Sequence, residues 1–354
     1  GCSNFESEGV MEQKRVRICD IAEELGLSTA TVSNVIHGKT KKISEKTVRR
    51  VQALLEERQY IPNMAGILLA QNDSKIIGVV INDHRKYEGH VLEDGFIAAS
   101  VNALARELDK TGFFLMIKIT PRWQDIPKFA SMWNMAGLVL LGCCEQDFQG
   151  LRDEIRVPFV VYDGSIKDGN RLVNLTLDNF DGGRQMGEHF RTLGHERVLY
   201  LADNDVHVDH LRFLGLRSVF PNAELLIIPM EKEERMKFYL ERLDFLRQYT
   251  AVFAASDYYA ADFLYFICAH GIQVPEEMSV AGFDNSALSA QLYPALTTIG
   301  QDHKKRAELA VELLQKLRRQ EQVHPEYLLP VTLIERNSTG RNIAGEKIRH
   351  EENE

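Results

Sequence analysis

Apolar residues near the amino terminus recur at helical spacing. Ile18, Ile21 and Leu25 lie three or four residues apart, which predicts a short helix that ends at Gly26. Ser28 is a favourable N-cap for a second helix. Because only Gly-Leu-Ser separates the two helices, the pattern is typical of a helix-turn-helix.

The second helix separates its apolar and polar positions. Val32, Val35 and Ile36 are expected to face inward, and Gly38 to close the helix. The outward positions are small or polar: Thr29, Ala30, Ser33 and Asn34. A third helix, capped by Ser44, follows with one apolar stripe and ends near residue 60, so we predict a compact all-α unit of three helices.

From Ile76 onward, short continuous apolar runs alternate with helical stretches. We expect strands over residues 76–81, 113–117, 137–141, 159–162, 198–201, 225–228, 251–254 and 279–282. Continuous apolar strands are covered on both faces, which indicates parallel sheets in an α/β fold. Because the series repeats once, with a break near residues 163–178, we predict two similar lobes rather than one sheet.

Composition narrows the class of protein. The 354 residues are 44% hydrophobic and 26% charged, as in globular chains, and no apolar run approaches the roughly 18 residues of a membrane span. Residues 1–13 carry three acidic residues and no apolar core, so we expect no secretory signal and a cytoplasmic protein. The five cysteines include no Cys-x-x-Cys pair, so we expect reduced thiols. We expect that the protein binds no metal ion and no cofactor.

The charge is unevenly distributed. Lys14 to Lys75 contains eleven basic and seven acidic residues, a net charge of +4, whereas the chain from Ile76 onward has a net charge of −10. A basic head on an acidic body suggests a small module that binds a polyanion, joined to a larger domain with another role.

The segment ICDIAEELGLSTATVSNVIHG, residues 18–38, resembles the DNA-binding headpiece of the lactose/galactose repressor (LacI/GalR) family. The similarity continues through residues 44–51 and 60–63 and, more loosely, to about residue 339. The resemblance implies a helix-turn-helix headpiece followed by a periplasmic-binding-protein-like domain of two α/β lobes, between which the chain crosses three times.

In a helix-turn-helix, the first turns of the second helix meet base edges in the major groove. We therefore expect Thr29, Ala30 and Asn34 to contact bases, since the Asn34 amide suits adenine and the Ala30 methyl suits thymine. Ser28, Thr31, Ser33 and the basic turn after residue 38 are expected to meet phosphates. Most relatives carry Arg where Asn34 stands, so the operator is predicted to differ from the family's usual one.

Residues 62–75 are predicted to form a hinge helix and linker. The helix that begins at Pro62 and Asn63 is too short to persist alone in water. The resemblance implies that paired hinge helices enter the minor groove, where Leu69 wedges into a base step. Gly66 replaces the family's usual Ala and weakens the helix by roughly 1 kcal/mol.

Ligands of parallel α/β sheets bind at the carboxyl ends of strands. Asp163, Asp257 and Asp284 follow predicted strands, and the resemblance places Asp163, Arg212 and Asp284 among the family's polar effector anchors. The further candidate effector contacts are Asp83, Tyr87, Ser256, Gln301 and His303. Carboxylates accept hydrogen bonds from hydroxyls, and a guanidinium bridges adjacent oxygens, which fits a small carbohydrate or related metabolite. Asp257 is the weakest candidate because it has the alternative role of helix cap.

Two other classes of protein, an α/β enzyme and a sugar-binding receptor, are alternatives. An α/β enzyme lacks support because no nucleophile elbow, phosphate loop or paired metal-spaced His is present; the His207-Val-Asp-His210 stretch is interpreted as a loop. A sugar-binding receptor would not carry the headpiece. We therefore predict a non-enzymatic, homodimeric transcriptional regulator, most simply a repressor, that binds a pseudo-palindromic double-stranded operator.

The expected organisation follows the chain. Residues 1–13 are expected to be disordered or a cloning remnant, 14–61 to form the headpiece and 62–75 the hinge. Residues 76–340 are expected to form the effector-binding and dimerisation domain. The chain is expected to cross between its two lobes near residues 163–178 and again within residues 291–325, with the third crossing near residues 291–303. Residues 341–354 are expected to be a disordered tail, and nothing in them predicts a coiled coil.

Overall fold

The computed structural model describes residues 16–61, 74–142, 151–164 and 171–342. The chain divides into two compact units, Gly1–Asn72 and Asp73–Glu354, hereafter the N-terminal and C-terminal units. No helix among the described residues is both long and apolar enough to cross a bilayer.

The N-terminal unit is a three-helix bundle, as predicted. Its helices are α1 (Ile18–Leu25), α2 (Thr29–Ile36) and α3 (Glu45–Glu57). Ile21, Val32 and Val51, one from each helix, are fully buried in its core. Two predicted caps are present, because the hydroxyls of Ser28 and Ser44 accept hydrogen bonds from the backbone N–H three residues ahead.

The first lobe of the C-terminal unit, lobe 1, is built on an all-parallel six-stranded sheet of order β11-β5-β4-β3-β1-β2. Its strands are β1 (Ile76–Asn82), β2 (Phe114–Thr120), β3 (Gly137–Leu141), β4 (Phe159–Tyr162), β5 (Leu172–Leu177) and β11 (Glu326–Leu329). Its helical elements are η1 (Arg85–Tyr87), η2 (Val91–Glu93), α5 (Gly95–Lys110), η3 (Trp123–Asp125), α6 (Ile126–Met132), α8 (Leu151–Glu154) and α14 (His303–Arg318).

The second lobe, lobe 2, has a six-stranded sheet of order β12-β10-β9-β8-β6-β7, parallel except for the β10–β12 pair. Its strands are β6 (Val198–Ala202), β7 (Glu224–Ile227), β8 (Ala251–Ala254), β9 (Ser279–Asp284), β10 (Thr297–Gly300) and β12 (Thr332–Ile334). Its helical elements are α9 (Asn179–Thr192), α10 (His207–Val219), α11 (Lys232–Glu241), α12 (Leu243–Leu246), α13 (Asp257–Ala269) and η4 (Ala287–Ala290). The predicted α/β fold with two lobes is confirmed.

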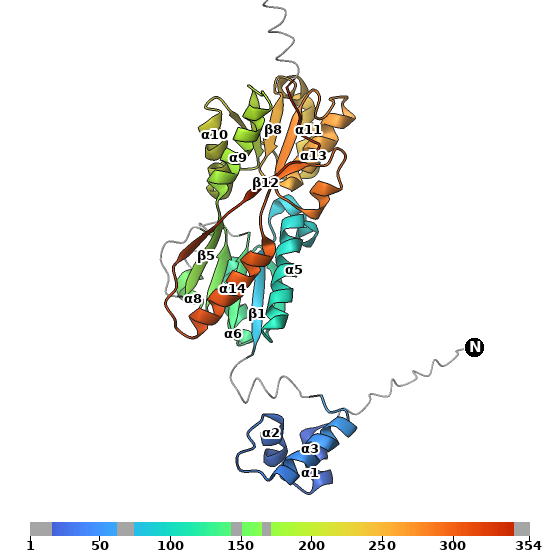
Figure 1. The fold of residues 1–354 in the computed structure, drawn as a ribbon, viewed down its shortest axis with the longest axis vertical. Coiled ribbons are helices and arrows are strands. Elements are labelled where there is room, and N and C mark those ends of the chain that lie inside the picture. The colour runs from blue at the N-terminus through green and yellow to red at the C-terminus, as the bar shows by residue number, and fades with distance from the viewer. Residues whose placement is uncertain (1–15, 62–73, 143–150, 165–170, 343–354) are drawn as a thin grey trace, which may run out of the picture. The chain divides into compact units, whose positions relative to one another are not determined.

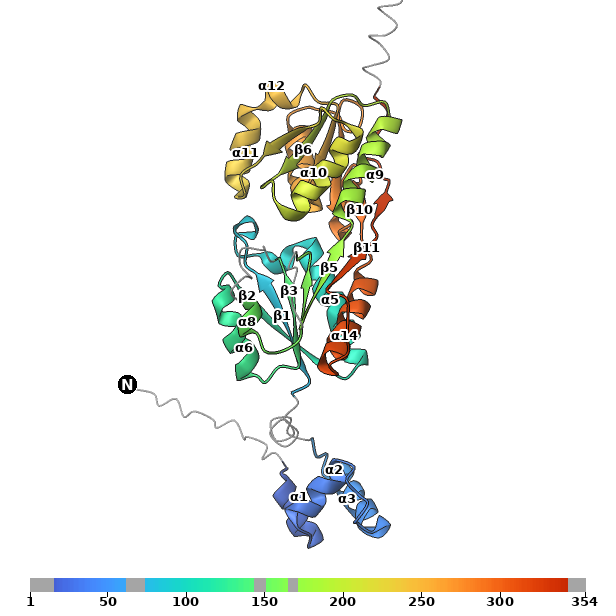
Figure 2. The same cartoon turned by 90° about the vertical axis from the view of Figure 1, so that its left-hand side faces the viewer.

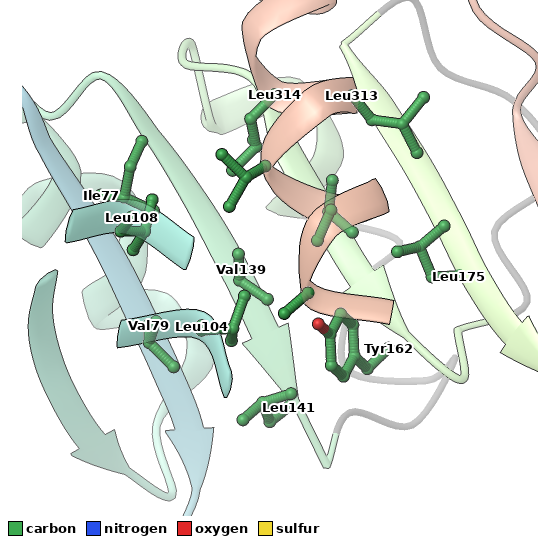
Figure 3. Packing of buried hydrophobic residues seen from close by; sticks show 14 of the residues in the cluster. Ile77, Val79, Leu104, Leu108, Val139, Leu141, Tyr162, Leu175, Leu313 and Leu314 are labelled. Atoms are coloured by element: carbon green, nitrogen blue, oxygen red, sulfur yellow. The ribbon is translucent and has the colours of Figure 1, made fainter. Parts of the chain in front are cut away.

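One face of the lobe 1 sheet is covered by α5 and α14. Figure 3 shows Leu104 and Leu108 of α5 and Leu314 of α14 packed over strand residues that include Val139. Each of these side chains is at most 1% exposed, and burying one contributes roughly 1.5–3 kcal/mol. This apolar layer fixes the strands whose carboxyl ends form the site described below.

The chain passes between the lobes three times, at residues 178, 301–302 and 330–331 (Figures 1 and 2). The prediction placed the first crossing over 163–178, but β5 still belongs to lobe 1, so the crossing comes only at Asp178. The sequence prediction also placed the third crossing near residues 291–303, but the crossing that the structure has there is the second one. Strands β5, β10, β11 and β12 were not predicted, and the third crossing lies between β11 and β12.

Helices α9 and α10 pack backbone against backbone. A Cβ added at Gly183 would overlap the carbonyl oxygen of Arg212, and one added at Gly215 would overlap that of Phe180. The two glycines therefore let the helices approach closely, and this approach sets the position of Arg212 on α10.

We predict that Gly183→Ala destabilises the C-terminal unit by about 1–3 kcal/mol, because the new methyl group forces the helices apart. Thermal unfolding of the variant checks this. Helix propensity alone predicts the opposite sign, a gain of up to about 1 kcal/mol, so a higher melting temperature would contradict the close packing.

Candidate functional site

The predicted base contacts share one exposed face of α2. Thr29, Ala30 and Asn34 are exposed, whereas Val32 and Val35 face the core of the bundle. The amphipathic pattern therefore orients the helix as expected. The face offers a hydroxyl, a methyl and an amide, three groups that distinguish base edges in the major groove.

Three of the predicted phosphate contacts have hydroxyl groups that contact other side chains of α2 or its caps. The Ser28 and Thr31 hydroxyls lie 2.8 Å apart at the N-terminus of α2. The half-buried Ser33 hydroxyl lies 3.4 Å from Nδ1 of His37, the C-cap residue. The basic turn Lys39, Lys41 and Lys42 is exposed. Asn63 and Leu69 lie outside the described residues.

The C-terminal unit contains a cavity of about 280 Å³ between its lobes, near the lower end of the usual size range of ligand pockets. It is lined by residues of both lobes, many of which follow strands or begin helices. Five of the nine predicted effector contacts line it: Tyr87, Asp163, Arg212, Ser256 and Asp284.

The two aspartates come directly after strands. Asp163 follows β4 of lobe 1, and Asp284 is the last residue of β9 in lobe 2. Both have positive φ, 56° and 114° respectively. A φ of 114° is strained for a residue with a side chain, and it places the Asp284 carboxyl group at the cavity.

A buried arginine that the sequence analysis missed connects these aspartates. Arg306, 0% exposed, pairs with Asp163 at 2.9 Å and donates to the Leu175 carbonyl at 2.5 Å. Its guanidinium also donates to Oε1 of Gln301 at 3.0 Å, and Nε2 of Gln301 lies 3.4 Å from Oδ1 of Asp284. A polar chain therefore runs from the lobe 1 sheet through the second crossing to lobe 2.

Four predicted contacts, Asp83, Asp257, Gln301 and His303, do not line the cavity. Gln301 serves the polar chain just described. Asp83 follows β1 and is half-buried, but its neighbours Asn82 and His84 line the cavity instead. His303 begins α14 with Nδ1 3.3 Å from the Ser100 hydroxyl, and burial lowers its pKa to about 4.

Asp257 is a buried structural residue. Its carboxyl group accepts hydrogen bonds from the Thr298 hydroxyl at 2.6 Å and the Ser286 N–H at 2.7 Å. The cap of α13 is Ser256, whose hydroxyl accepts from the Tyr259 N–H, so the alternative of a cap at Asp257 was also wrong. Burial raises the pKa of Asp257 to about 6.

Arg212 is held rigidly at the cavity wall. Its Nε donates to Asn179 Oδ1 at 2.8 Å, and its Nη1 donates to the Ala255 carbonyl at 2.5 Å. The guanidinium lies 3.5 Å from the centroid of the Phe283 ring, and Asp209 lies 3.9 Å away. The side chain is therefore fixed before any ligand binds.

Several lining residues were not predicted, chiefly Lys86, Asp94, Asp203 and Asp209. Asp203 follows β6, so the strand-end rule that found Asp163 would have found it. Asp94 precedes an apolar helix and looked like an ordinary cap. It is indeed the N-cap of α5, accepting from the Ile97 N–H at 3.0 Å.

The stretch from His207 to His210 was interpreted as a loop but forms the first turn of α10, and His207 and Asp209 line the cavity. The Asn204 amide donates to Asp209 at 2.8 Å and to Asp203 at 2.7 Å. Among the described residues, no group of three or more His, Cys, Asp or Glu side chains is placed to hold a metal ion.

Known proteins share both units. A model of "Bacterial regulatory proteins, lacI family" matches residues 17–63, and a model of "Periplasmic binding protein-like domain" matches residues 188–339. The sucrose operon repressor of Streptococcus mutans is 27% identical over 333 residues, 90% of this chain and 98% of that protein. The lactose operon repressor of Escherichia coli is 26% identical over 339 residues, 92% and 91% of the two chains.

Solved structures agree with the fold. The Lac repressor dimer bound to operator and the anti-inducer ONPF superposes with a TM-score of 0.78 at 26% identity, covering 92% of this chain and all of that one. The regulator CelR in complex with cellobiose has a TM-score of 0.66 at 23% identity over 92% of this chain and 100% of that one.

A helix-turn-helix unit followed by two α/β lobes that enclose a cavity defines a DNA-binding transcriptional regulator rather than an enzyme. The chain has a DNA-binding domain of the lacI family and a periplasmic-binding-protein-like domain, and it is similar over most of its length to repressors of this family, as the sequence predicted.

We predict that Asn34→Ala weakens binding to the cognate operator by about 1–3 kcal/mol and leaves binding to random DNA nearly unchanged. The exposed amide would be lost without any change in the core. Fluorescence anisotropy on both DNAs at fixed salt measures the difference, with Gln52→Ala, an exposed amide on α3, as the matched control. Equal losses on both DNAs would refute base contact by Asn34.

The buried Asp257 predicts a pH dependence of stability. Its pKa in the folded protein, about 6, lies above the ordinary value of 3.8, so its contribution to stability is fully present below pH 3.8 and is lost as the pH rises through 6. Asp257→Asn should therefore gain about 3 kcal/mol relative to wild type between pH 4 and 7. Denaturant unfolding at several pH values checks this, and a pH-independent difference would contradict it.

Proposed function

We propose that the protein is a homodimeric repressor that binds a pseudo-palindromic operator and that a small carbohydrate in the cavity between the lobes changes its operator affinity. The observation that carries this proposal is the cavity itself, which is lined by residues of both lobes. A ligand there contacts both lobes at once, so it favours one arrangement of the lobes over others.

The chemistry of the cavity wall supports a carbohydrate. Asp163 and Asp284 supply hydrogen-bond acceptors, and Arg212 supplies a guanidinium. Four aromatic rings also line the cavity: Tyr87, Phe96, Tyr162 and Tyr259. Apolar walls with a few placed polar groups are typical of small-molecule sites. Relatives named for sucrose and lactose operons, and one solved in complex with cellobiose, point to the same class.

A homodimer is supported by the requirement for two headpieces on a pseudo-palindrome and by a similar repressor that was solved as a dimer on its operator. Edge strand β2 exposes Phe114, Ile117 and Ile119, and lobe 2 exposes Tyr265 and Tyr293. Exposed apolar side chains of this kind suit a subunit interface. Because the operator is the DNA that it is proposed to bind, we propose that the protein acts in the cytoplasm.

The proposed function is tested in two steps with the full-length protein. Selection from a random DNA pool should yield a palindromic sequence that the protein binds far more tightly than random DNA. A thermal-shift screen against neutral sugars, sugar phosphates and purines should then find a carbohydrate that raises the melting temperature. Failure to select any sequence would refute the DNA-binding role of α2, and stabilisation by purines alone would refute a carbohydrate effector.

We predict that Asp284→Gly weakens binding of the effector sugar about tenfold, because the sugar loses hydrogen bonds to the carboxyl group that contribute roughly 0.5–1.5 kcal/mol each. Stability without sugar should change by less than about 1 kcal/mol, because glycine relieves the strain at a φ of 114° but adds entropy to the unfolded chain.

Calorimetric titration measures this loss of affinity. Gln320→Gly is the matched control, since Gln320 also has positive φ, 60°, but is exposed and does not line the cavity. An unchanged sugar affinity in Asp284→Gly would remove Asp284 from the effector site.

A further inference from the structure

We propose that the effector is a carbohydrate without phosphate, sulfate or carboxylate groups and that the charge of the cavity excludes anionic sugars. This inference rests on the proposed carbohydrate effector and narrows its chemical class. It is carried by the number, placement and existing partners of the charged residues around the cavity.

Carboxyl groups outnumber cations at the cavity wall. Five aspartates line it, Asp94, Asp163, Asp203, Asp209 and Asp284, against two cationic side chains, Lys86 and Arg212. The aspartates still outnumber the cations when Arg306, which lies behind Asp163, is included. The aspartates come from both lobes, so closure of the lobes around a ligand concentrates negative charge.

The two lining cations already have partners. Arg212 directs Nε and Nη1 to Asn179 and Ala255, and Asp209 lies 3.9 Å away. Lys86 places its Nζ 4.9 Å from the centroid of Tyr87 and 5.7 Å from that of Tyr259. Desolvation by itself lowers the pKa of Lys86, but neighbours that include Tyr87 and Asp203 outweigh it and hold that pKa well above its ordinary value.

Two of the helix N-termini that reach the cavity are capped. Such N-termini ordinarily attract phosphate groups. Here Asp94 caps α5 and Ser256 caps α13, whereas α10 has no side-chain cap and carries the acidic Asp209 in its first turn. At α5 and α13 the protein's own oxygen atoms therefore fill the positions that an anionic ligand would otherwise use.

The cavity already disfavours its own negative charge. Burial raises the pKa values of Asp94 and Asp209, and it raises that of Asp284 well above its ordinary value. A phosphate or carboxylate of a ligand would lose its hydration in the same place, and the surroundings that raise these pKa values disfavour its negative charge in the same way.

The wall is well suited to hydroxyl groups. The Tyr162 hydroxyl belongs to a side chain that is 2% exposed and lines the cavity, and it has no hydrogen-bond partner among the described residues. The labelled view in Figure 3 shows this ring beside the apolar layer of lobe 1. A sugar hydroxyl can pair with Tyr162 and with the aspartates as donor or acceptor, which a fully ionised phosphate cannot do.

The test compares matched ligands on the full-length protein. Calorimetry or thermal shift is performed with neutral mono- and disaccharides, including glucose, galactose, sucrose and cellobiose. Each is paired with its 6-phosphate or, for the monosaccharides, its uronate. Any neutral sugar that binds should bind at least about 100-fold more tightly than its anionic counterpart.

A charge variant tests the cause. Asp94→Asn removes one carboxylate and keeps a residue that caps helices equally well. The preference for the neutral sugar over its phosphate should fall about tenfold. Asp302→Asn is the matched control, because Asp302 caps α14 in the same way, accepting from the Lys305 N–H at 2.9 Å, but does not line the cavity. The control should leave the preference unchanged.

The outcomes are distinct. If a sugar phosphate or uronate binds as tightly as its neutral parent, the charge inference is wrong while the carbohydrate effector stands. If no sugar of either kind binds, the carbohydrate effector is refuted and this inference with it. If Asp94→Asn and Asp302→Asn alter the preference equally, the charge of the cavity is not its cause.

Discussion

The arrangement of the C-terminal unit depends on one buried charge, the guanidinium of Arg306. A cation that is 0% exposed needs a charged partner and hydrogen bonds that compensate for its lost hydration. Asp163, the Leu175 carbonyl and Gln301 supply these to Nη1 and Nη2, and they come from the end of β4, from β5 and from the second crossing. The contact with Arg306 fixes the Asp163 carboxylate at the cavity. Gln301, which accepts from Arg306, also contacts Asp284 of lobe 2.

This constraint links packing to recognition. The apolar layer of α5 and α14 holds the lobe 1 strands, and the close approach of α9 and α10 at Gly183 and Gly215 holds Arg212 in lobe 2. Polar groups are thus rigid before a ligand arrives, so little ordering entropy is lost on binding. A ligand between the lobes acts on crossings that are few and short, which lets it change how the lobes are arranged.

Local patterns predicted much of this structure. The helix-turn-helix followed from apolar spacing and from Ser28 and Gly26, and the eight expected strands all correspond to strands of the two sheets. Strands β5, β10, β11 and β12 were missed because they are short or, like β5 with Asn174 and Thr176, interrupted by polar residues, and all four lie next to a crossing. Asp163, Arg212 and Asp284 were found from strand ends and family resemblance. Lys86, Asp94 and Arg306 were missed because their positions depend on tertiary folding, and Asp257 was misassigned because sequence does not show that its carboxyl group turns toward Thr298.

The most direct test of the account is the operator affinity of the full-length protein, measured by fluorescence anisotropy with and without a saturating sugar that stabilises the protein thermally. Coupling of about 1–3 kcal/mol, typical of allosteric proteins, predicts a change of about 5- to 150-fold in the dissociation constant. An operator affinity that stays the same while the sugar is bound would contradict the claim that the cavity controls DNA binding.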